Sequence, residues 1–207
     1  MIECYGGSHH QVDRSTNEDA FVIGRDPVPY AAVCDGAGNA LQAAHRVIRF
    51  FERMIKDPQA QVADPEAWMN WVRLMDSQLL GGTQSTFVGV AVSDEKSCLV
   101  VGAYAGNSRV YVVGENGVRL VTTESSPARL GSGKVKPCPI MLALDPYDIL
   151  LLMSDGAWNP LGRMYKLQKT AARAAMRHFS EVPQAILDAA ARIGRYDDMT
   201  AVALRIR

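Results

Sequence analysis

Short apolar runs separated by Gly and Pro fill the first third of the chain, and the apolar spacing then becomes helical. Between residues 39 and 55 the apolar positions recur every three or four residues, which predicts an amphipathic helix. A second helix should begin at Pro65 with Asp64 as its N-cap, and Gly81-Gly82 should end it. Three earlier runs have the length and the bounding turn residues of strands. They are residues 2–5, 20–24 and 30–34.

The middle of the chain has the pattern of strands, and the last third returns to helices. Glu115-Asn116-Gly117 separates two apolar runs and is a strong hairpin signal, so we expect an antiparallel meander here. Two helices should follow, at 166–179 and 183–193, with Gly194 as a C-cap. The predicted strands are 86–92, 98–104, 109–113, 118–122, 148–154 and 199–206.

Strands grouped before and after helices, without strict alternation of strand and helix, predict a layered α+β fold. The 207 residues fit a single domain spanning residues 1–207, and we find no linker or repeat.

Composition and charge narrow the functional classes. The 22 basic and 22 acidic side chains balance, so no global field favours nucleic acid, and we expect neither a nucleic-acid nor a membrane partner. The four cysteines are too far apart for a zinc knuckle or a redox pair. With no membrane-length apolar stretch and no signal-peptide pattern at the start, we expect a cytoplasmic protein.

Two segments, at 31–38 and 150–158, share one design, an apolar strand that ends in Asp-Gly. The strand would fix Asp35 or Asp155 at its tip, and the Gly would permit a sharp turn that exposes a carbonyl to a ligand. Asp-Gly is also common turn chemistry, so either segment alone is weak evidence for a metal site.

Further acids stand at the ends of strands, namely Glu18 and Asp19 before one strand and Asp197 and Asp198 before the last. Carboxylates about 4 Å apart repel by roughly 4 kcal/mol per pair at an effective dielectric near 20, so converging acids would need protons or cations. Oxygen ligands without Cys or His at zinc spacing favour Mg²⁺ or Mn²⁺.

Six short blocks follow one another along nearly the whole chain. They are Arg14 with Asn17-Glu18-Asp19-Ala20; Val33 with Asp35-Gly36 and Gly38; Ser85-Thr86; Gly106-Asn107-Ser108-Arg109; Ser154-Asp155-Gly156 with Trp158; and Asp197-Asp198-Met199-Thr200 with Val202. In this order the blocks resemble those of the metal-dependent protein serine/threonine phosphatases of the 2C class, the PPM family. The chain is similar to a short bacterial-type variant of that family.

The resemblance implies a four-layer α-β-β-α sandwich, with two central antiparallel sheets flanked by helices and two Mn²⁺ or Mg²⁺ ions at one edge. Arg14 would bind the phosphate, although it could instead pair with Glu18. Water or hydroxide bridging the metals would attack phosphoserine or phosphothreonine directly. Asp197 is favoured over Asp198 as the ligand, because Asp198 aligns with an amide. The implied catalytic residues are Asp35, Asp155 and Asp197, and the implied metal ligands are Glu18, Asp19, Asp35, Gly36, Asp155 and Asp197.

The sequence departs from the family at several positions. Ala37 replaces a His that many members carry, so another group would have to protonate the leaving group. Asn107 and Asn159 replace acids, which weakens a third metal site. Between Thr123 and Asp148 the chain is short, and the family's mobile flap is reduced to a loop.

These departures leave three functions open. The first is an active protein phosphatase, monomeric, acting on a phosphoprotein in the pathway of a cognate serine/threonine kinase. The second is a catalytically weak or inactive relative that serves as a regulatory or binding module. The third is a phosphatase for small molecules, which an open cleft would allow.

Overall fold

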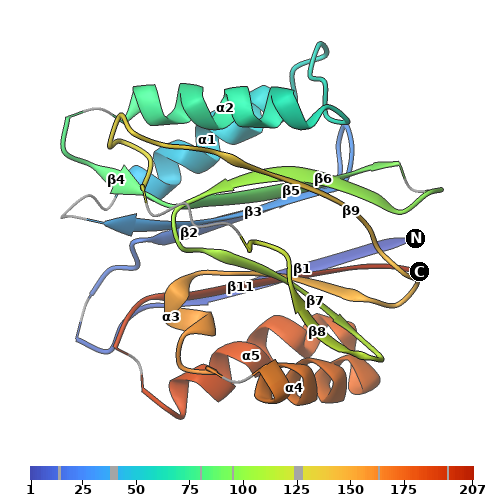
Figure 1. Cartoon of the computed structure of the whole chain (residues 1–207). Helices are drawn as coiled ribbons and strands as arrows, with labels where there is room; N and C mark the ends of the chain where they lie inside the picture. The colour runs from blue at the N-terminus through green and yellow to red at the C-terminus, as the bar shows by residue number, and fades with distance from the viewer. Residues whose placement is uncertain are drawn as a thin grey trace.

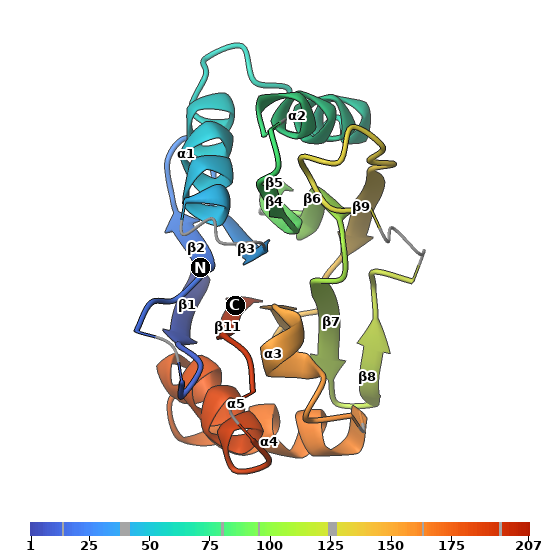
Figure 2. The ribbon, with the colours of Figure 1, turned by 90° about the vertical axis from the view of Figure 1, so that its left-hand side faces the viewer.

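The computed structural model of the chain describes residues 1–13, 15–37, 42–79, 81–94, 96–123, 128–162, 164–194 and 196–207. Two antiparallel sheets face each other, and a pair of helices covers the outer side of each (Figures 1 and 2). The predicted α+β sandwich of four layers is therefore confirmed.

One sheet, which we call the β3 sheet, has the strand order β2-β3-β5-β6-β9, and β4 pairs with the end of β3. Its strands are β2 (Asp19–Gly24), β3 (Tyr30–Ala37), β4 (Gln84–Ser85), β5 (Phe87–Asp94), β6 (Leu99–Ala105) and β9 (Cys138–Ala143).

The facing sheet, which we call the β10 sheet, has the order β1-β11-β10-β7-β8 and contains both ends of the chain. Its strands are β1 (Ile2–His9), β7 (Arg109–Gly114), β8 (Gly117–Leu120), β10 (Ile149–Met153) and β11 (Met199–Ile206).

The helices on the β3 sheet are α1 (Ala43–Ile55) and α2 (Pro65–Gln78), and those on the β10 sheet are α4 (Met164–Arg177) and α5 (Val182–Ala191). Two short helices, α3 (Asp155–Trp158) and η1 (Phe179–Glu181), connect elements of the second half. The predicted start of α2 is confirmed, since Pro65 is its first residue and the Asp64 side chain accepts a hydrogen bond from Glu66 N–H. No helix in the described ranges has the length and hydropathy needed to cross a bilayer.

Alternation of side chains along the central strands builds three apolar layers. Leu150 and Leu152 of β10 point into the core between the sheets, whereas Leu151 and Met153 pack under α4 and α5. On β3, Cys34 and its neighbours at even positions pack under α1 and α2. Both central strands are buried on both faces, which explains their nearly continuous apolar sequence.

The predicted meander is wrong in one respect, because β5 and β6 belong to one sheet and β7 and β8 to the other. The chain crosses between the sheets at Gly106, where φ is +90° and a Cβ would lie 2.7 Å from the Thr86 methyl group. Apolar alternation predicts a strand and its buried faces, but it does not say which sheet the strand joins.

A second difference lies in the segment predicted as a shortened loop. Residues 138–143 form the edge strand β9, which pairs with β6 from Tyr104↔Cys138 to Leu99↔Ala143. Pro139 and the exposed Met141 weakened its strand pattern, and both are tolerated here because β9 pairs on one side only.

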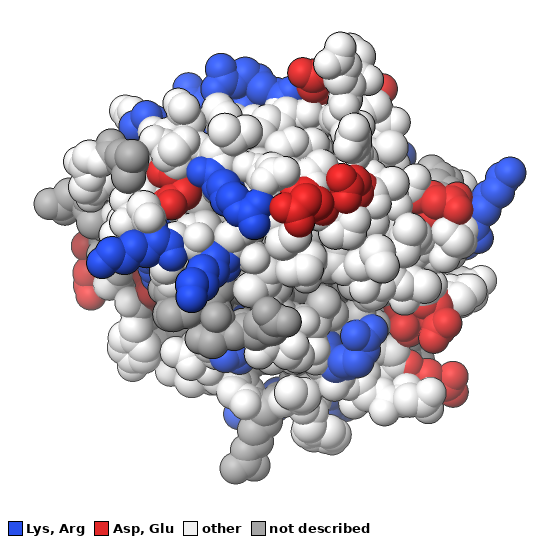
Figure 3. All heavy atoms as spheres, turned by 45° about the horizontal axis from the view of Figure 1, so that its top comes forward, with Lys and Arg blue, Asp and Glu red and all other residues white. Residues whose placement is uncertain are grey.

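Acidic and basic side chains are interspersed over the face drawn in Figure 3. This mixed distribution agrees with the zero formal net charge of the sequence.

Candidate active site

The end of β3 and the helix α3, which carry two of the predicted acids, lie at one edge of the sandwich, toward the left in Figure 1. Asp19 begins β2 and is paired in register with Asp35 near the end of β3. Asp155 begins α3 directly after β10, and Asp197 precedes β11 by two residues. Each sheet therefore contributes acids from the starts or ends of neighbouring strands.

Thr86 holds the main chain of Asp35 with two hydrogen bonds. The Asp35 N–H donates to Thr86 Oγ1 over 2.9 Å, and its carbonyl accepts from Thr86 N–H over 2.8 Å. Burial is the main reason that the pKa of Asp35 is raised to about 7; the Arg129 guanidinium opposes this rise, and the carboxylates of Asp155 and Asp197 add to it. Asp155 and Asp197 therefore each lie close enough to Asp35 to repel its carboxylate.

Asp19 connects the two sheets. It is only 4% exposed, and its Oδ2 accepts a hydrogen bond of 2.7 Å from Ser154 Oγ at the end of β10. Ser154 Oγ accepts in turn from Thr200 N–H on β11. Burial, and then the neighbouring Asp35, raise the pKa of Asp19 well above its usual value.

Asp155 is oriented by the block that follows β6. Asn107 Nδ2 donates to Asp155 Oδ2 over 2.7 Å, and Trp158 Nε1 donates to the Asn107 carbonyl over 3.1 Å. The Arg109 guanidinium lies 3.4 Å from the centre of the Trp158 ring. The amide of Asn107 thus donates to Asp155 a hydrogen bond that a carboxylate at this position could not.

Asp197 and Asp198 have different surroundings. Asp198 is 3% exposed, and its two oxygens accept from Gln11 N–H over 2.7 Å and from Glu18 N–H over 2.6 Å. Asp197 Oδ1 accepts from Asp198 N–H over 2.9 Å. Backbone donors bind both Asp198 oxygens, so Asp198 anchors the segment that carries Glu18, and the choice of Asp197 as the ligand stays a prediction.

The two Asp-Gly pairs act through close backbone approach, and the sharp turn predicted from them is wrong. Gly36 lies within β3 and Gly156 within α3, and neither is among the glycines with positive φ. A Cβ on Gly36 would lie 2.7 Å from the Glu18 carbonyl oxygen, and one on Gly156 would overlap the Asp198 carbonyl oxygen. Each glycine therefore lets the segment that carries one acid pack closely against the segment that carries another.

Two predicted positions, Arg14 and Gly38, lie outside the described residues. The structure adds Arg129, which the sequence analysis missed. Its Nη2 lies 3.2 Å from Asp35 Oδ2. Arg129 belongs to the segment taken as a featureless loop, and nothing in the local pattern distinguishes it from a surface arginine.

The clustered carboxylate oxygens suit a divalent cation, although they do not by themselves complete its coordination. Asp155 Oδ1 is buried and lacks a hydrogen-bond partner, and Asp35 Oδ2 is buried against the Arg129 guanidinium, as expected for oxygens that would face a cation. Within the described ranges, no three His, Cys, Asp or Glu side chains are arranged to bind one ion directly. Water or a small movement of the carboxylates would be needed to complete the coordination of Mg²⁺ or Mn²⁺.

A cavity of about 950 Å³ lies elsewhere, between α1 and α2. Arg46, Arg49, Arg53 and Lys56 line one side of it, and none of the clustered acids takes part. It does not overlap the candidate metal site.

Comparison with known proteins agrees with the geometry. Residues 30–207 match the Stage II sporulation protein E (SpoIIE) family. A search of curated protein sequences found no match.

Solved structures of phosphatases share the fold over essentially the whole chain. A bacterial serine phosphatase, solved as an arginine-to-alanine variant, has a TM-score of 0.88 at 20% identity, with 100% of this chain and 99% of that chain covered. The catalytic domain of the serine/threonine phosphatase PstP, solved with two manganese ions, has a TM-score of 0.82 at 19% identity, with 99% and 97% covered. The PPM Ser-Thr phosphatase MsPP from Mycobacterium smegmatis, solved with cacodylate, has a TM-score of 0.80 at 16% identity, with 99% and 98% covered.

At these identities the structural likeness establishes the fold, and the sequence match establishes the family. The chain belongs to the Stage II sporulation protein E family and has the fold of the PPM-type phosphatases.

Proposed function

We propose that this protein is a metal-dependent phosphatase that hydrolyses phosphoserine or phosphothreonine in proteins, with two Mn²⁺ or Mg²⁺ ions at the acid cluster. The observation that carries this proposal is the convergence of Asp19, Asp35, Asp155 and Asp197 from two sheets at one edge, with a buried Asp155 oxygen that lacks a hydrogen-bond partner. The PstP structure with two manganese ions, which shares the fold, supports the same cofactor here.

Each acid has a position suited to its proposed role. Asp35 would help to hold both ions, because it is paired in register with Asp19 and the carboxylates of Asp155 and Asp197 lie close enough to raise its pKa. Asp155 and Asp197 would complete one coordination shell together with the Gly36 carbonyl. Glu18 and Asp19 would serve the other ion, directly or through water, although the hydrogen bond from Ser154 limits the movement of Asp19.

The bound ions would supply positive charge that polarises the phosphate and acidifies the attacking water. The chain supplies orientation. Thr86 fixes the backbone of Asp35, and Asn107 fixes the carboxylate of Asp155. Arg14 would hold the phosphate with two parallel hydrogen bonds, and its role rests on the sequence motif alone.

The test is hydrolysis of p-nitrophenyl phosphate and of a phosphothreonine peptide by the purified protein, with Mn²⁺ and with chelator. We expect Mn²⁺-dependent activity that Asp35→Asn and Asp197→Asn each reduce by more than about 100-fold, since changes at residues that merely orient metal ligands already cost about 10- to 100-fold. Asp57→Asn is the matched control, because Asp57 is an exposed aspartate in the turn after α1. Preference for the peptide over the small ester would distinguish a protein phosphatase from a small-molecule phosphatase.

A weak or inactive binding module is the second candidate. It is favoured by the open coordination shell among the described residues and by Ala37, which offers no proton to a leaving group. Binding of a phosphopeptide without turnover under every metal condition would support it. The cognate kinase pathway, the monomeric state and the cytoplasmic location stay predictions from the sequence.

A further inference from the structure

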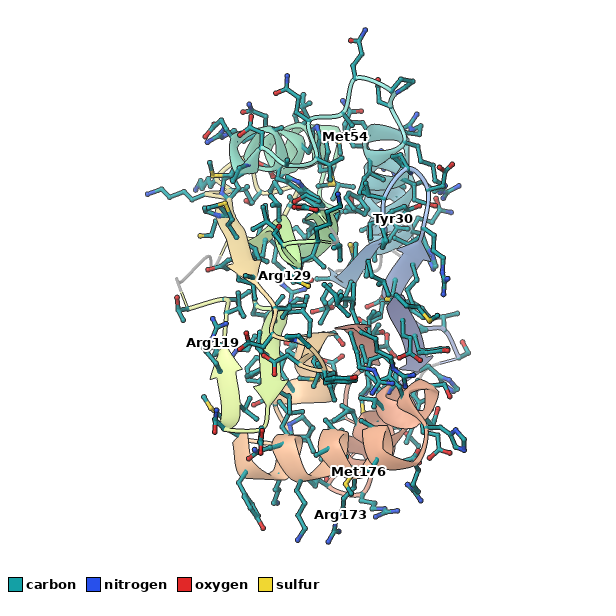
Figure 4. The ribbon with its side chains drawn as sticks, turned by 90° about the vertical axis from the view of Figure 1, so that its right-hand side faces the viewer. Tyr30, Met54, Arg119, Arg129, Arg173 and Met176 are labelled. Atoms are coloured by element: carbon teal, nitrogen blue, oxygen red, sulfur yellow. The ribbon has the colours of Figure 1, made fainter. Side chains whose placement is uncertain are left out.

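Arg129 forms an ion pair with the carboxylate at the centre of the candidate metal site. Its Nη2 lies 3.2 Å from Asp35 Oδ2, and the two side chains are 24% and 11% exposed. Figure 4 labels Arg129 near the middle of the molecule, between the halves that contain the two helix pairs. The positive charge thus lies where a divalent cation would also be needed.

The backbone that carries Arg129 is firmly anchored. The next residue, Leu130, is fully buried and exchanges two backbone hydrogen bonds with Ser85, of 2.8 and 3.2 Å. Beyond it, Gly131 N–H and Gly133 N–H both donate to Asp76 Oδ1 on α2. These contacts hold the segment from two sides without any help from the acid cluster.

The same frame holds Asp35. Ser85 precedes Thr86, and Thr86 exchanges hydrogen bonds with the backbone of Asp35. Leu130, the neighbour of Arg129, and Asp35 are therefore bonded to two adjacent residues, Ser85 and Thr86. The fold thus holds the backbone of Arg129 beside that of Asp35.

The guanidinium of Arg129 is incompletely bonded. Its Nη2 contacts Asp35 Oδ2 at 3.2 Å, and its Nη1 is buried without a hydrogen-bond partner. In the buried pair of Arg205 and Glu3 the contacts are shorter, with Nε at 2.9 Å and Nη2 at 2.7 Å from Glu3 Oε2. A carboxylate that pairs with a neighbouring positive charge can exchange that charge for a metal ion.

We propose that Arg129 is a built-in counter-cation of the metal site, which neutralises Asp35 in the metal-free protein and must yield this carboxylate to an incoming divalent ion. This inference rests on the proposed function, since it takes Asp35 as a metal ligand. Two cations that share one carboxylate repel each other, so Arg129 lowers the affinity for the metal. Without the metal, removal of Arg129 leaves a buried carboxylate unpaired, which is strongly destabilising.

The proposal predicts opposite effects on two measurements. In Arg129→Gln, Mn²⁺ affinity measured by isothermal titration calorimetry should rise by about tenfold, because the competing charge is gone. The Tm of the metal-free protein should fall, and most of this loss should disappear at saturating Mn²⁺. Arg129→Lys keeps the charge and should bind Mn²⁺ with nearly the affinity of the unchanged protein.

Arg205→Gln is the matched control. It breaks the buried ion pair of Arg205 and Glu3, which lies near the end of β11, whereas the acid cluster lies near the start of that strand. It should lower the Tm equally with and without Mn²⁺ and leave the affinity unchanged.

Mn²⁺ affinity that is unchanged or weaker in Arg129→Gln would overturn the proposal, because Arg129 would then only support the fold or orient Asp35 for the metal. Tighter Mn²⁺ binding without hydrolysis of any phosphate ester would sustain the role of Arg129 and reject the proposed function. If neither the unchanged protein nor Arg129→Gln binds Mn²⁺, both proposals fail.

Discussion

Ser154 Oγ donates a hydrogen bond of 2.7 Å to Asp19 Oδ2, and this bond joins the end of β10 to the start of β2. The two residues belong to different sheets and are separated by 135 positions in the sequence. Because Asp19 accepts this bond and Asp155 directly follows Ser154, the bond fixes how the acids of one sheet face those of the other.

Replacement of Ser154 by Ala should destabilise the protein and loosen the site together. The change leaves the buried Asp19 oxygen and Thr200 N–H without their partner, at a cost of about 1–3 kcal/mol. Urea unfolding measures this cost, and Mn²⁺ affinity should fall as well. Ser77→Ala, at an exposed serine on α2, is the control. A loss of stability no larger than that of the control would show that the bond contributes little.

Asn107→Asp tests whether the amide at this position orients Asp155. The change replaces a hydrogen-bond donor at 2.7 Å with a second carboxylate, so we expect a loss of about 1 kcal/mol in the metal-free protein. Mn²⁺ should restore much of the loss, because a cation relieves repulsion between the carboxylates. Asn107→Ser removes the charge effect and serves as the comparison. Equal stability of the two variants without metal would contradict this account.

Asp197→Asn and Asp198→Asn should have opposite consequences. Asp198→Asn replaces an acceptor of two backbone hydrogen bonds with an amide that can accept only through one atom, so it should cost about 1–3 kcal/mol of stability and largely keep Mn²⁺ binding. Asp197→Asn should lose Mn²⁺ binding with little effect on stability. Chemical denaturation and calorimetry on both variants decide the assignment, and the reverse result would make Asp198 the ligand.

The metal-free protein should lose stability as the pH rises toward neutrality. Burial raises the pKa of Asp35 from 3.8 to about 7, so the folded state holds this proton more tightly than the unfolded state does. The stabilisation is complete below the unfolded pKa and is lost as pH increases through about 7, with no further loss above it.

The variant Asp35→Asn lacks this titration. The free energy of unfolding of the unchanged protein should therefore exceed that of the variant by an amount that decreases as the pH rises from about 4 to about 7. Denaturation of metal-free samples across this range measures the difference. A difference that does not change with pH would mean that Asp35 titrates normally.

Local signals in the sequence predicted most of the fold, since the central strands are buried on both faces and α2 has a complete start signal. The sheet to which each strand belongs could not be predicted, because the crossover at Gly106 depends on packing against Thr86. Strand β9 was missed because its edge position tolerates Pro139 and an exposed Met141.

For the site, the motifs predicted which acids would converge, and the structure brings Asp19, Asp35, Asp155 and Asp197 to one edge. The motifs could not predict what holds them there. Asn107 reaches Asp155 from 48 residues away, and the Asp198 carboxylate binds backbone N–H groups at residues 11 and 18. Contacts of this kind depend on tertiary geometry and produce no recognisable pattern in the sequence. The contact of Arg129 with Asp35 is the clearest case.

The most direct test of the central claim is calorimetric titration of the metal-free protein with Mn²⁺, alongside Asp35→Asn. If the acids of the two sheets hold a pair of cations, the unchanged protein should bind two Mn²⁺ ions per chain, and Asp35→Asn should lose both or bind one of them weakly. No saturable Mn²⁺ binding, or equal binding by Asp35→Asn, would contradict the account.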